Sequence, residues 1–550
     1  MNERRSSLTN TQSSFMHGAM ILIAANVIVK IIGALFKVPL TNLIGSEGMG
    51  YFQTAYSIYQ LLFVLSTAGL PVAISKMVSE NAALGRWADV KRIFNVSLVV
   101  FMVVGLAASL IMFFGADAFS KAANNDKAMT SVLVIAPAIF FVAIMSTFRG
   151  FFQGLSNMIP TAMSQVVEAA AKLVIGFLAA YMIIKAGQSI ELAASGAVTG
   201  ITVGSVLGAI LMWVYYQRSK RVREIKSLAK GQQARPGREI FRQLLKIAVP
   251  VTIGASVISI TNLIDLLLVM NRLGDAGFTQ AQANSLYGTY TSMAVTLFNL
   301  PPSIVVSLSI SIIPIISAAF AVGDKVKLHA TIGSGLRIGM LIAMPCAIGL
   351  AVLSKPILSL IFFKRLNEVE IAAPLLTSLG AGVLFVCMVS ITNSMLQAIS
   401  RPNIPVYTML CGGVVKLVTN YFLVGTPSIN IGGAPIGTTL CYATITILNF
   451  IMLIKVTHIR PNFLNMLIKP LVSAAAMGIG SYVCYNALAR VINPNVATLA
   501  ALVVAVLVYF FMLVALRGFI REDLLLMPKG RKLVSIMERF GWIKKERISK

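Results

Sequence analysis

The chain has 550 residues, of which 57% are hydrophobic and 12% charged, and its mean hydropathy is +0.84. Soluble domains have about 45–50% apolar and about 25% charged residues, so a water-soluble fold would leave much of this apolar sequence in water. The net charge is +27. In a chain of this hydropathy the positive-inside rule explains such a charge, and we expect no nucleic-acid partner.

Apolar runs of about 20 residues follow one another along the chain, and each is long enough to cross a bilayer as a helix. The sequence lacks the short alternating segments of membrane β-barrels, so we predict an all-α polytopic membrane protein with about fourteen transmembrane helices. The predicted spans are residues 17–42, 51–78, 93–114, 131–153, 160–184, 194–216, 245–270, 286–320, 329–353, 371–399, 404–424, 434–456, 466–488 and 496–517. The run 286–320 contains three prolines and is expected to kink or break.

Lys and Arg are distributed unequally between the two sides of these spans. If the N-terminus is cytoplasmic, most of the 46 Lys and Arg residues fall in cytoplasmic segments. The loop with Lys355, Lys364 and Arg365 is the exception, because it is basic on the outer side. We therefore predict a multi-pass protein of the cell membrane with both termini in the cytoplasm.

A weak internal repeat divides the chain. At one constant offset Gln153 coincides with Gln397, Ser156 with Ser400 and Lys172 with Lys416, and further on Gly196–Gly200 matches Gly433–Gly437. We predict two pseudo-symmetric six-helix lobes, as in transporters built from two rocking bundles, followed by two extra helices. The predicted parts are an N-lobe at 1–216, a basic cytoplasmic linker at 217–243, a C-lobe at 244–457, two helices at 458–517 and a basic cytoplasmic tail at 518–550.

Ionisable and polar side chains inside the spans are candidates for function, because an ionised group costs roughly 2.5–3.5 kcal/mol at the centre of a spanning helix. Asn26, Lys30, Gly33 and Lys37 lie on one face of the first span. We expect this face to line a cavity that binds an anionic ligand; the alternative is that Lys37 reaches the interface and Lys30 pairs structurally. The expected substrate-binding residues are Lys30, Lys37, Asn26 and Gln60.

Two acid–lysine pairs are predicted within the spans. Asp265 lies in apolar sequence and needs a cationic partner, for which Lys416 is the first choice. Glu168 and Lys172 are expected to pair at i, i+4 in the fifth span. Either the pairs only hold helices together, or they rearrange as the two halves move.

Motifs for catalysis or metal binding do not stand out in the sequence. There is no phosphate-binding loop of the G-x-x-x-x-G-K-[ST] type and no H-E-x-x-H motif. The three histidines lack metal-ligand spacing, and the five cysteines fit neither a disulfide framework nor a zinc site. We therefore expect a protein that is not an enzyme and that uses no cofactor and no metal.

Residues 14–60, followed by the stretch GLPVAISKMVSE at 69–80, resemble the polysaccharide biosynthesis (oligosaccharide flippase) family of the MOP superfamily. The resemblance covers nearly the whole chain, and it points to the YtgP/SpoVB branch of Gram-positive bacteria, which is related to MurJ. It implies a MATE/MurJ-like fold, alternating access and an undecaprenyl-linked substrate, which for MurJ is lipid II.

The resemblance also implies roles for residues. MurJ-type proteins carry arginines in the first span as R-x-x-G-x-x-R, and the matching stretch here has Lys30, Gly33 and Lys37, with the second cation one position late. Lysine is a point charge and lacks the bidentate fork of arginine. Some relatives hold sodium between spans 7, 11 and 12; Asp265 and Asn420 match that site, and we expect the ammonium of Lys416 to replace the ion. The expected coupling residues are Asp265, Lys416, Asn420, Glu168 and Lys172.

Together these observations predict a transporter that flips an undecaprenyl-diphosphate-linked sugar, lipid II for peptidoglycan first, from the inner to the outer leaflet. The alternatives are a flippase for another lipid-linked oligosaccharide, a MATE-type multidrug or cation antiporter, and a non-transporting membrane partner recruited through the basic tail. The expected partners are the lipid-linked sugar diphosphate, membrane lipids and cell-wall synthesis proteins, and the protein is expected to act as a monomer.

Overall fold

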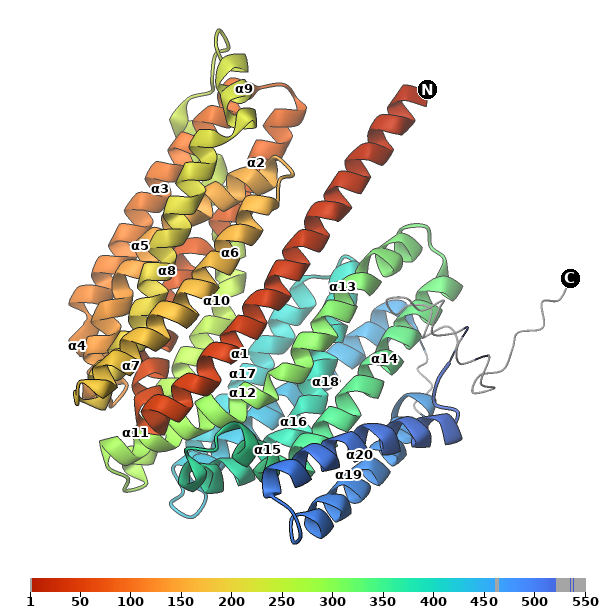
Figure 1. Cartoon of the computed structure of the whole chain (residues 1–550). Coiled ribbons are helices and arrows are strands. Elements are labelled where there is room, and N and C mark those ends of the chain that lie inside the picture. Colours follow the sequence, from red (N-terminus) through yellow and green to blue (C-terminus); the bar gives the residue numbers. More distant parts are fainter. Residues whose placement is uncertain (1, 460–463, 521–534, 536–537, 539–550) are drawn as a thin grey trace, which may run out of the picture. The chain divides into compact units, whose positions relative to one another are not determined.

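The computed structural model describes residues 2–459, 464–520, 535 and 538. These residues form helices joined by short loops, and they divide into two compact units. Unit 1 comprises residues 1–274 and 278–288, and unit 2 comprises residues 275–277 and 289–550 (Figure 1). The predicted tail, 518–550, lies outside the described residues except for 518–520, 535 and 538.

The helices of unit 1 are α1 (Asn2–Thr67), α2 (Gly69–Ala83), α3 (Trp87–Phe114), α4 (Ala116–Ala122), η1 (Asp126–Ala128), α5 (Met129–Gly154), α6 (Ile159–Ala171), η2 (Lys172–Gly176), α7 (Phe177–Lys185), α8 (Ile190–Arg218), α9 (Lys220–Leu228), α10 (Gly237–Asp275) and α11 (Gln280–Thr289). Those of unit 2 are η3 (Tyr290–Ala294), α12 (Val295–Phe298), α13 (Leu300–Ala321), α14 (Lys325–Val352), α15 (Ser354–Ile361), α16 (Leu366–Ala398), α17 (Asn403–Val424), η4 (Asn430–Gly432), α18 (Gly433–Thr457), η5 (Leu464–Ile468), α19 (Lys469–Leu488) and α20 (Pro494–Ala515).

The helix lengths confirm the polytopic fold. In the part of the chain that the structure describes, twelve helical segments are long and apolar enough to cross a membrane. The first of them, residues 24–83, is 60 residues long and accounts for both of the first two predicted spans. The predicted span at 286–320 is also present, and it is broken as expected: α11, the π-helical η3, α12 and α13 follow one another, with the last break at Asn299, just before Pro301.

Gly45 divides α1 into two helices. Its φ of 70° and ψ of −176° lie in a region that only glycine adopts readily. Phe36 and Phe52 flank this glycine and are 16 positions apart, which is roughly 24 Å along a straight helix. Their ring centroids are 5.8 Å apart, so the chain folds back at Gly45.

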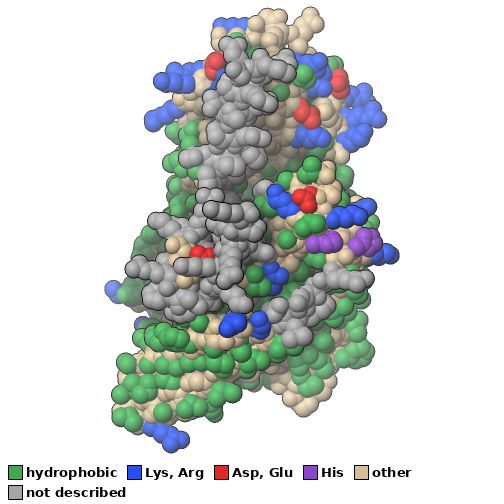
Figure 2. Space-filling model, turned by 90° about the vertical axis from the view of Figure 1, so that its right-hand side faces the viewer, with side chains coloured by type: hydrophobic (Ala, Val, Ile, Leu, Met, Phe, Trp, Pro, Cys, Tyr) green, Lys and Arg blue, Asp and Glu red, His purple; other side chains and the backbone are tan. Residues whose placement is uncertain are grey.

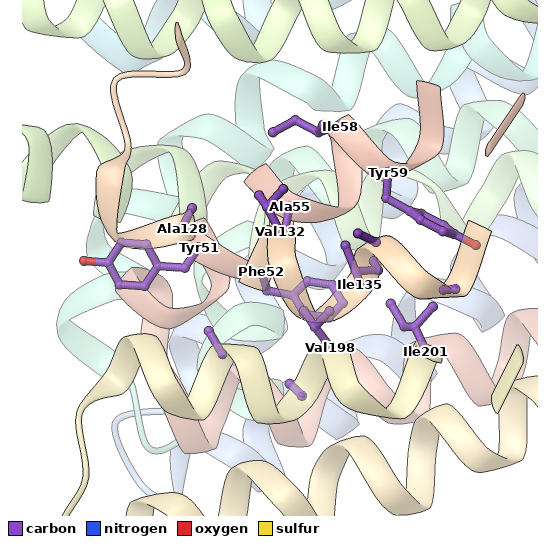
Figure 3. Close-up of a cluster of buried hydrophobic side chains, with 14 of the residues drawn as sticks. Tyr51, Phe52, Ala55, Ile58, Tyr59, Ala128, Val132, Ile135, Val198 and Ile201 are labelled. Atoms are coloured by element: carbon purple, nitrogen blue, oxygen red, sulfur yellow. The ribbon is translucent and has the colours of Figure 1, made fainter. Parts of the chain in front are cut away.

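The second part of α1 packs into the core of unit 1. Figure 3 shows Tyr51, Phe52 and Ala55 of this helix against Val132 and Val198, which belong to α5 and α8. These side chains are nearly inaccessible to solvent. The outer faces of the helices carry many exposed large apolar side chains, as expected of surfaces that face lipid. Figure 2 shows Lys and Arg side chains gathered at the end of unit 1 that carries α9.

The internal repeat is confirmed at the loops that follow α5 and α16. Ser156 and Ser400, which the repeat pairs, both adopt left-handed φ values, 59° and 62°. Their N–H groups donate to the carbonyls of Gln153 and Gln397 at 2.9 and 3.1 Å. In both loops the next N–H donates to the carbonyl five positions back at 2.9 Å. Both helices therefore end in the same Schellman-type cap.

The repeat is confirmed again where glycines let two helices approach. A methyl group on Gly200 of α8 would lie 2.8 Å from the carbonyl oxygen of Lys172. A methyl group on Gly437 of α18 would lie 3.5 Å from the carbonyl oxygen of Lys416. The two lysines that the sequence aligned thus occupy corresponding positions, each beside the corresponding glycine of the next spanning helix.

The predicted linker at 217–243 is folded onto unit 1. Helix α9 buries Val222 and Ile225 and presents its basic residues outward. After it, Arg235 donates its backbone N–H to one carboxylate oxygen of Asp89 at 2.8 Å and its Nε to the other at 3.0 Å. Asp89 is buried, so this pairing fixes the segment to the start of α3.

The compact units and the predicted lobes are divided at different places in the sequence. Helix α10 was assigned by sequence to the C-lobe at 244–457, but it packs with unit 1, where the N–H of Gly69 donates to Oγ1 of Thr252 at 3.1 Å. A methyl group on Gly69 would lie 2.0 Å from the carbonyl oxygen of Ala248, so the two backbones are in close contact. The division between the compact units falls near residue 288 of the sequence, and the predicted lobe boundaries stay a prediction.

Candidate functional site

The ammonium group of Lys172 is surrounded by aromatic rings inside unit 1. It lies 5.1 Å from the ring centroid of Phe36, 5.6 Å from that of Phe52 and 5.0 Å from that of Tyr56. Each cation–π contact is worth about 0.5–1 kcal/mol at exposed sites and about 2 kcal/mol where it is desolvated. Lys172 is half-buried, and the two phenylalanines are fully buried. The rings therefore hold a cation that would be costly in plain hydrocarbon.

Two features of the backbone assemble this arrangement. The reversal at Gly45 brings Phe36, from the first part of α1, next to Phe52 and Tyr56, from the second part. Lys172 is the first residue of η2, a π-helical turn inside the fifth span. Such turns are rare, and they occur frequently at functional sites.

Glu168 precedes Lys172 by one turn but forms its ion pair with another residue. Its Oε2 accepts from the guanidinium of Arg149 on α5 at 3.1 Å, and Nε of Arg149 also donates to Oγ of Ser164 at 2.9 Å. Among the described residues no ion pair joins Glu168 to Lys172, so the predicted i, i+4 pair is corrected. The reason is that the planar guanidinium reaches the carboxylate directly, whereas the rings of α1 hold the lysine. The charge of Glu168 still acts on Lys172 at longer range.

Lys37 adds a further positive charge to this region. It is half-buried, it follows Phe36 directly in α1, and its charge acts on that of Lys172. Lys37 forms no ion pair with any residue that the structure describes. Arg149 pairs with Glu168, and the charges of Glu168 and Lys37 both act on Lys172, so three cations accompany one carboxylate and the group has a net positive charge. We call these four residues, with the rings of Phe36, Phe52 and Tyr56, the cation–aromatic cluster.

The other predicted substrate-binding residues lie on both parts of α1. Asn26 and Lys30 are exposed on the first part, and Gln60 is half-buried on the second. The expectation that Lys30 and Lys37 face one chamber between the two lobes stays a prediction.

The predicted coupling residues Asp265, Lys416 and Asn420 are divided between the two units. Asp265 is buried in α10 of unit 1, whereas Lys416 is half-buried and Asn420 fully buried in α17 of unit 2. Gly437 of α18 leaves room for Asn420, because a methyl group there would lie 2.0 Å from its Oδ1. The pairing of Asp265 with Lys416, and the replacement of sodium by the lysine ammonium, stay predictions. Within the described residues no group of three or more His, Cys, Asp or Glu is arranged to hold a metal ion.

Sequence reasoning missed Arg149 and the aromatic rings. Arg149 lies within the predicted span 131–153 and within α5, but it is not among the predicted site residues. The rings did leave a signal: Phe52, Tyr56, Tyr59 and Phe63 follow each other at spacings of three and four, which places them on one helix face. In the structure neighbouring rings of this stripe have centroids 5.6–6.0 Å apart.

Comparison with known proteins agrees with this fold. The sequence matches the family described as "Polysaccharide biosynthesis protein" over residues 15–320, and the one described as "MatE" over residues 250–422. Stage V sporulation protein B of Bacillus subtilis (strain 168) is 29% identical over 458 residues, which cover 82% of this chain and 85% of that protein. Lipid II flippase MurJ of the same organism is 25% identical over 452 residues, which cover 80% of this chain and 82% of that protein.

Solved structures share the architecture at low sequence identity. "Lipid II flippase MurJ, inward closed conformation" superposes with a TM-score of 0.67 at 15% identity, covering 90% of this chain and 98% of that one. An inward-facing multidrug resistance MATE family transporter of the MOP superfamily gives a TM-score of 0.63 at 15% identity. The match covers 78% of this chain and 95% of that one. The predicted all-helical, multi-pass membrane fold is confirmed. Because the first family match extends over more than half of the sequence, this chain belongs to the polysaccharide biosynthesis protein family.

Proposed function

We propose that this protein is a flippase that carries an undecaprenyl-diphosphate-linked sugar, with lipid II as the first candidate, from the inner to the outer leaflet. Its similarity to a protein named lipid II flippase, at 25% identity, supports this substrate class. The single observation that carries the proposal is the excess of positive charge in the cation–aromatic cluster, where Lys37 and Lys172 accompany one ion pair.

A diphosphate headgroup suits this cluster for electrostatic reasons. Glu168 already has an ion-pair partner in Arg149, so the charges of Lys37 and Lys172 are not neutralised by it. An ammonium group is a compact charge with three rotatable donors, and it can follow a phosphate oxygen as the helices move. The rings of Phe52 and Tyr56 add flat apolar faces beside the charge. These faces suit the apolar side of a sugar ring.

The membrane potential favours transport in this direction. Each elementary charge that crosses 100 mV gains or loses about 2.3 kcal/mol, so a diphosphate with roughly two negative charges gains about 4–5 kcal/mol on leaving a negative cytoplasm. This gain requires that no countercharge moves with the substrate. The proposal includes alternating access, cytoplasmic termini, a monomeric state and cell-wall synthesis proteins as partners. It also includes the coupling roles of Asp265, Lys416 and Asn420.

A MATE-type antiporter is the second candidate, because residues 250–422 match the MatE family and the folds are alike. Transporters of cationic drugs need acidic groups to bind their cargo. The cation–aromatic cluster has the opposite charge, and its one carboxylate is bound to Arg149. The cluster therefore favours an anionic substrate over a cationic one.

The test is rescue of a strain depleted of its lipid II flippase, with the leaflet distribution of the precursor measured directly. We expect rescue by the unchanged protein and by the Lys37→Arg/Lys172→Arg variant, and loss of rescue by Lys37→Gln/Lys172→Gln. Lys185→Gln is the matched control, because Lys185 is exposed at the end of α7 in the same unit. Rescue by the double glutamine variant at normal expression would refute the proposed site. Drug resistance without rescue would favour the antiporter.

A further inference from the structure

Unit 2 contains a basic pocket at the end of two of its spanning helices. The loop before α17 and the last turns of α18 line an open pocket of about 510 Å³. Arg401 and Lys455 contribute the charged part of its lining, and Ile404, Met452 and Val456 contribute apolar surface. A phosphate group fits easily into this volume. The pocket lies on the side of the membrane that the distribution of Lys and Arg predicts to be cytoplasmic.

The two cations of this pocket are available to a ligand. Arg401 and Lys455 are both exposed. Neither forms an ion pair with another residue in the part of the chain that the structure describes. Two cations beside one pocket attract an anion, and their aliphatic stems together with Met452 let its apolar portion remain in contact with the protein.

An apolar surface begins directly beside the pocket. On α17 the exposed side chains Tyr407, Leu410, Val414 and Val418 follow at spacings of three and four, so they form one continuous face of the helix. Tyr407 is 67% exposed and Val414 59% exposed, which in a spanning helix places them against lipid. A ligand with an anionic head and a long apolar tail matches the basic pocket and the apolar helix face beside it.

The repeat shows that the pocket is specific to unit 2. By the same alignment that pairs Ser156 with Ser400 and Gly196 with Gly433, Arg401 corresponds to Asn157 and Met452 to Tyr215. In unit 1 the amide of Asn157 donates to the hydroxyl of Tyr215 at 3.3 Å, and this bond ties the loop to the end of α8. Unit 2 has a cation and a flexible thioether at the same two positions.

We infer that this pocket binds the phosphate headgroup of an anionic membrane lipid, whose acyl chains lie along the exposed face of α17. The occupant is a lipid of the surrounding leaflet, and the site is separate from the cation–aromatic cluster of unit 1. Free phosphate shares the charge but cannot use the apolar face. Each basic residue near an anionic membrane surface strengthens binding about fivefold, so the two together account for roughly 25-fold.

The test measures binding of phosphatidylglycerol and phosphatidylcholine to the purified full-length protein by native mass spectrometry. We expect phosphatidylglycerol to bind more tightly than phosphatidylcholine. The Arg401→Gln/Lys455→Gln variant should lose roughly 25-fold in affinity for phosphatidylglycerol. Inorganic phosphate at 10 mM should not displace the lipid. Lys325→Gln/Lys327→Gln is the matched control, because both lysines are exposed at the start of α14 in the same unit. This control should bind within twofold of the unchanged protein.

A second variant tests the pocket by its shape. Arg401→Asn/Met452→Tyr copies the residues of unit 1, and we expect it to close the pocket and to reduce binding of phosphatidylglycerol while the melting temperature in zwitterionic detergent stays unchanged. Equal affinity for the two lipids, or glutamine and control variants that bind alike, would overturn the inference. Displacement of the lipid by inorganic phosphate would overturn it too, because the site would then be one for small anions.

Discussion

For the ion pair between Arg149 and Glu168, we predict that replacing one partner destabilises the protein more than replacing the other. The two side chains are 14% and 26% exposed, and the N–O distance is 3.1 Å. Breaking a fully buried pair costs about 3–5 kcal/mol. Allowing for the partial exposure of this pair, we expect a coupling energy of about 2 kcal/mol between the two residues.

The neighbouring lysines make the two single substitutions unequal. Glu168→Gln leaves the largely buried guanidinium of Arg149 without its carboxylate, in a region that also carries the charge of Lys172, so we expect a loss of about 2–3 kcal/mol. Arg149→Gln leaves a carboxylate one helical turn from Lys172, whose ammonium then becomes its partner, so we expect a loss of about 1 kcal/mol. The double variant removes both charges, and it should be less destabilised than the sum of the single variants.

The assay is reversible unfolding in mixed micelles, followed by circular dichroism for the two single variants and the double variant. Arg221 and Glu224 serve as the control pair: they are 2.8 Å apart but 51% and 55% exposed, so their coupling should stay below about 0.5 kcal/mol. A Glu168→Gln variant as stable as Arg149→Gln, or additive effects at this pair, would refute the electrostatic account of the cluster.

Three further substitutions and one control substitution test the packing of unit 1. Gly200→Ala should destabilise the protein by about 1–3 kcal/mol, because its methyl group meets Gly176 at 2.5 Å, whereas Gly254→Ala, with open space around it, should not; thermal unfolding measures both. Gly45→Ala should cost about 1–3 kcal/mol in the same assay, because φ is 70° there. Asp89→Asn weakens the bond to Arg235 and should speed tryptic cleavage of the 217–243 segment in limited proteolysis.

The spanning helices were predictable because each one is specified locally. An apolar run of about 20 residues has few alternatives to a membrane helix. The repeat was predictable for a related reason: Lys172 and Lys416 are costly in apolar sequence, so their correspondence carries more weight than matches between apolar residues. The caps at Ser156 and Ser400 show that the correspondence extends to the backbone.

The partners of the charged groups were not predictable from spacing along one helix. Glu168 and Lys172 are one turn apart, which is the favourable geometry for a local pair. The outcome is decided by Arg149 on α5 and by rings that reach Lys172 only because α1 reverses at Gly45. The turn at Gly45 lies between the predicted spans 17–42 and 51–78, but the sequence does not show which side chains the reversal brings beside Lys172.

The contacts of the 217–243 segment and of α10 were not predictable for a similar reason. A polar, basic segment such as 217–243 is typical of a linker, and composition alone does not show what it packs against. Asp89 is buried at the start of α3 and provides the partner that holds Arg235. The long-range contact between Gly69 and Thr252 keeps α10 with unit 1.

The most direct test of the central claim uses the purified protein in liposomes that contain a lipid-linked sugar diphosphate. The measured quantity is the rate at which the headgroup becomes accessible in the opposite leaflet, with and without an imposed membrane potential. We expect the unchanged protein and Lys37→Arg/Lys172→Arg to move the lipid, faster when the receiving side is positive, and Lys37→Gln/Lys172→Gln to be inactive although folded. Undiminished movement by the glutamine variant would contradict the account.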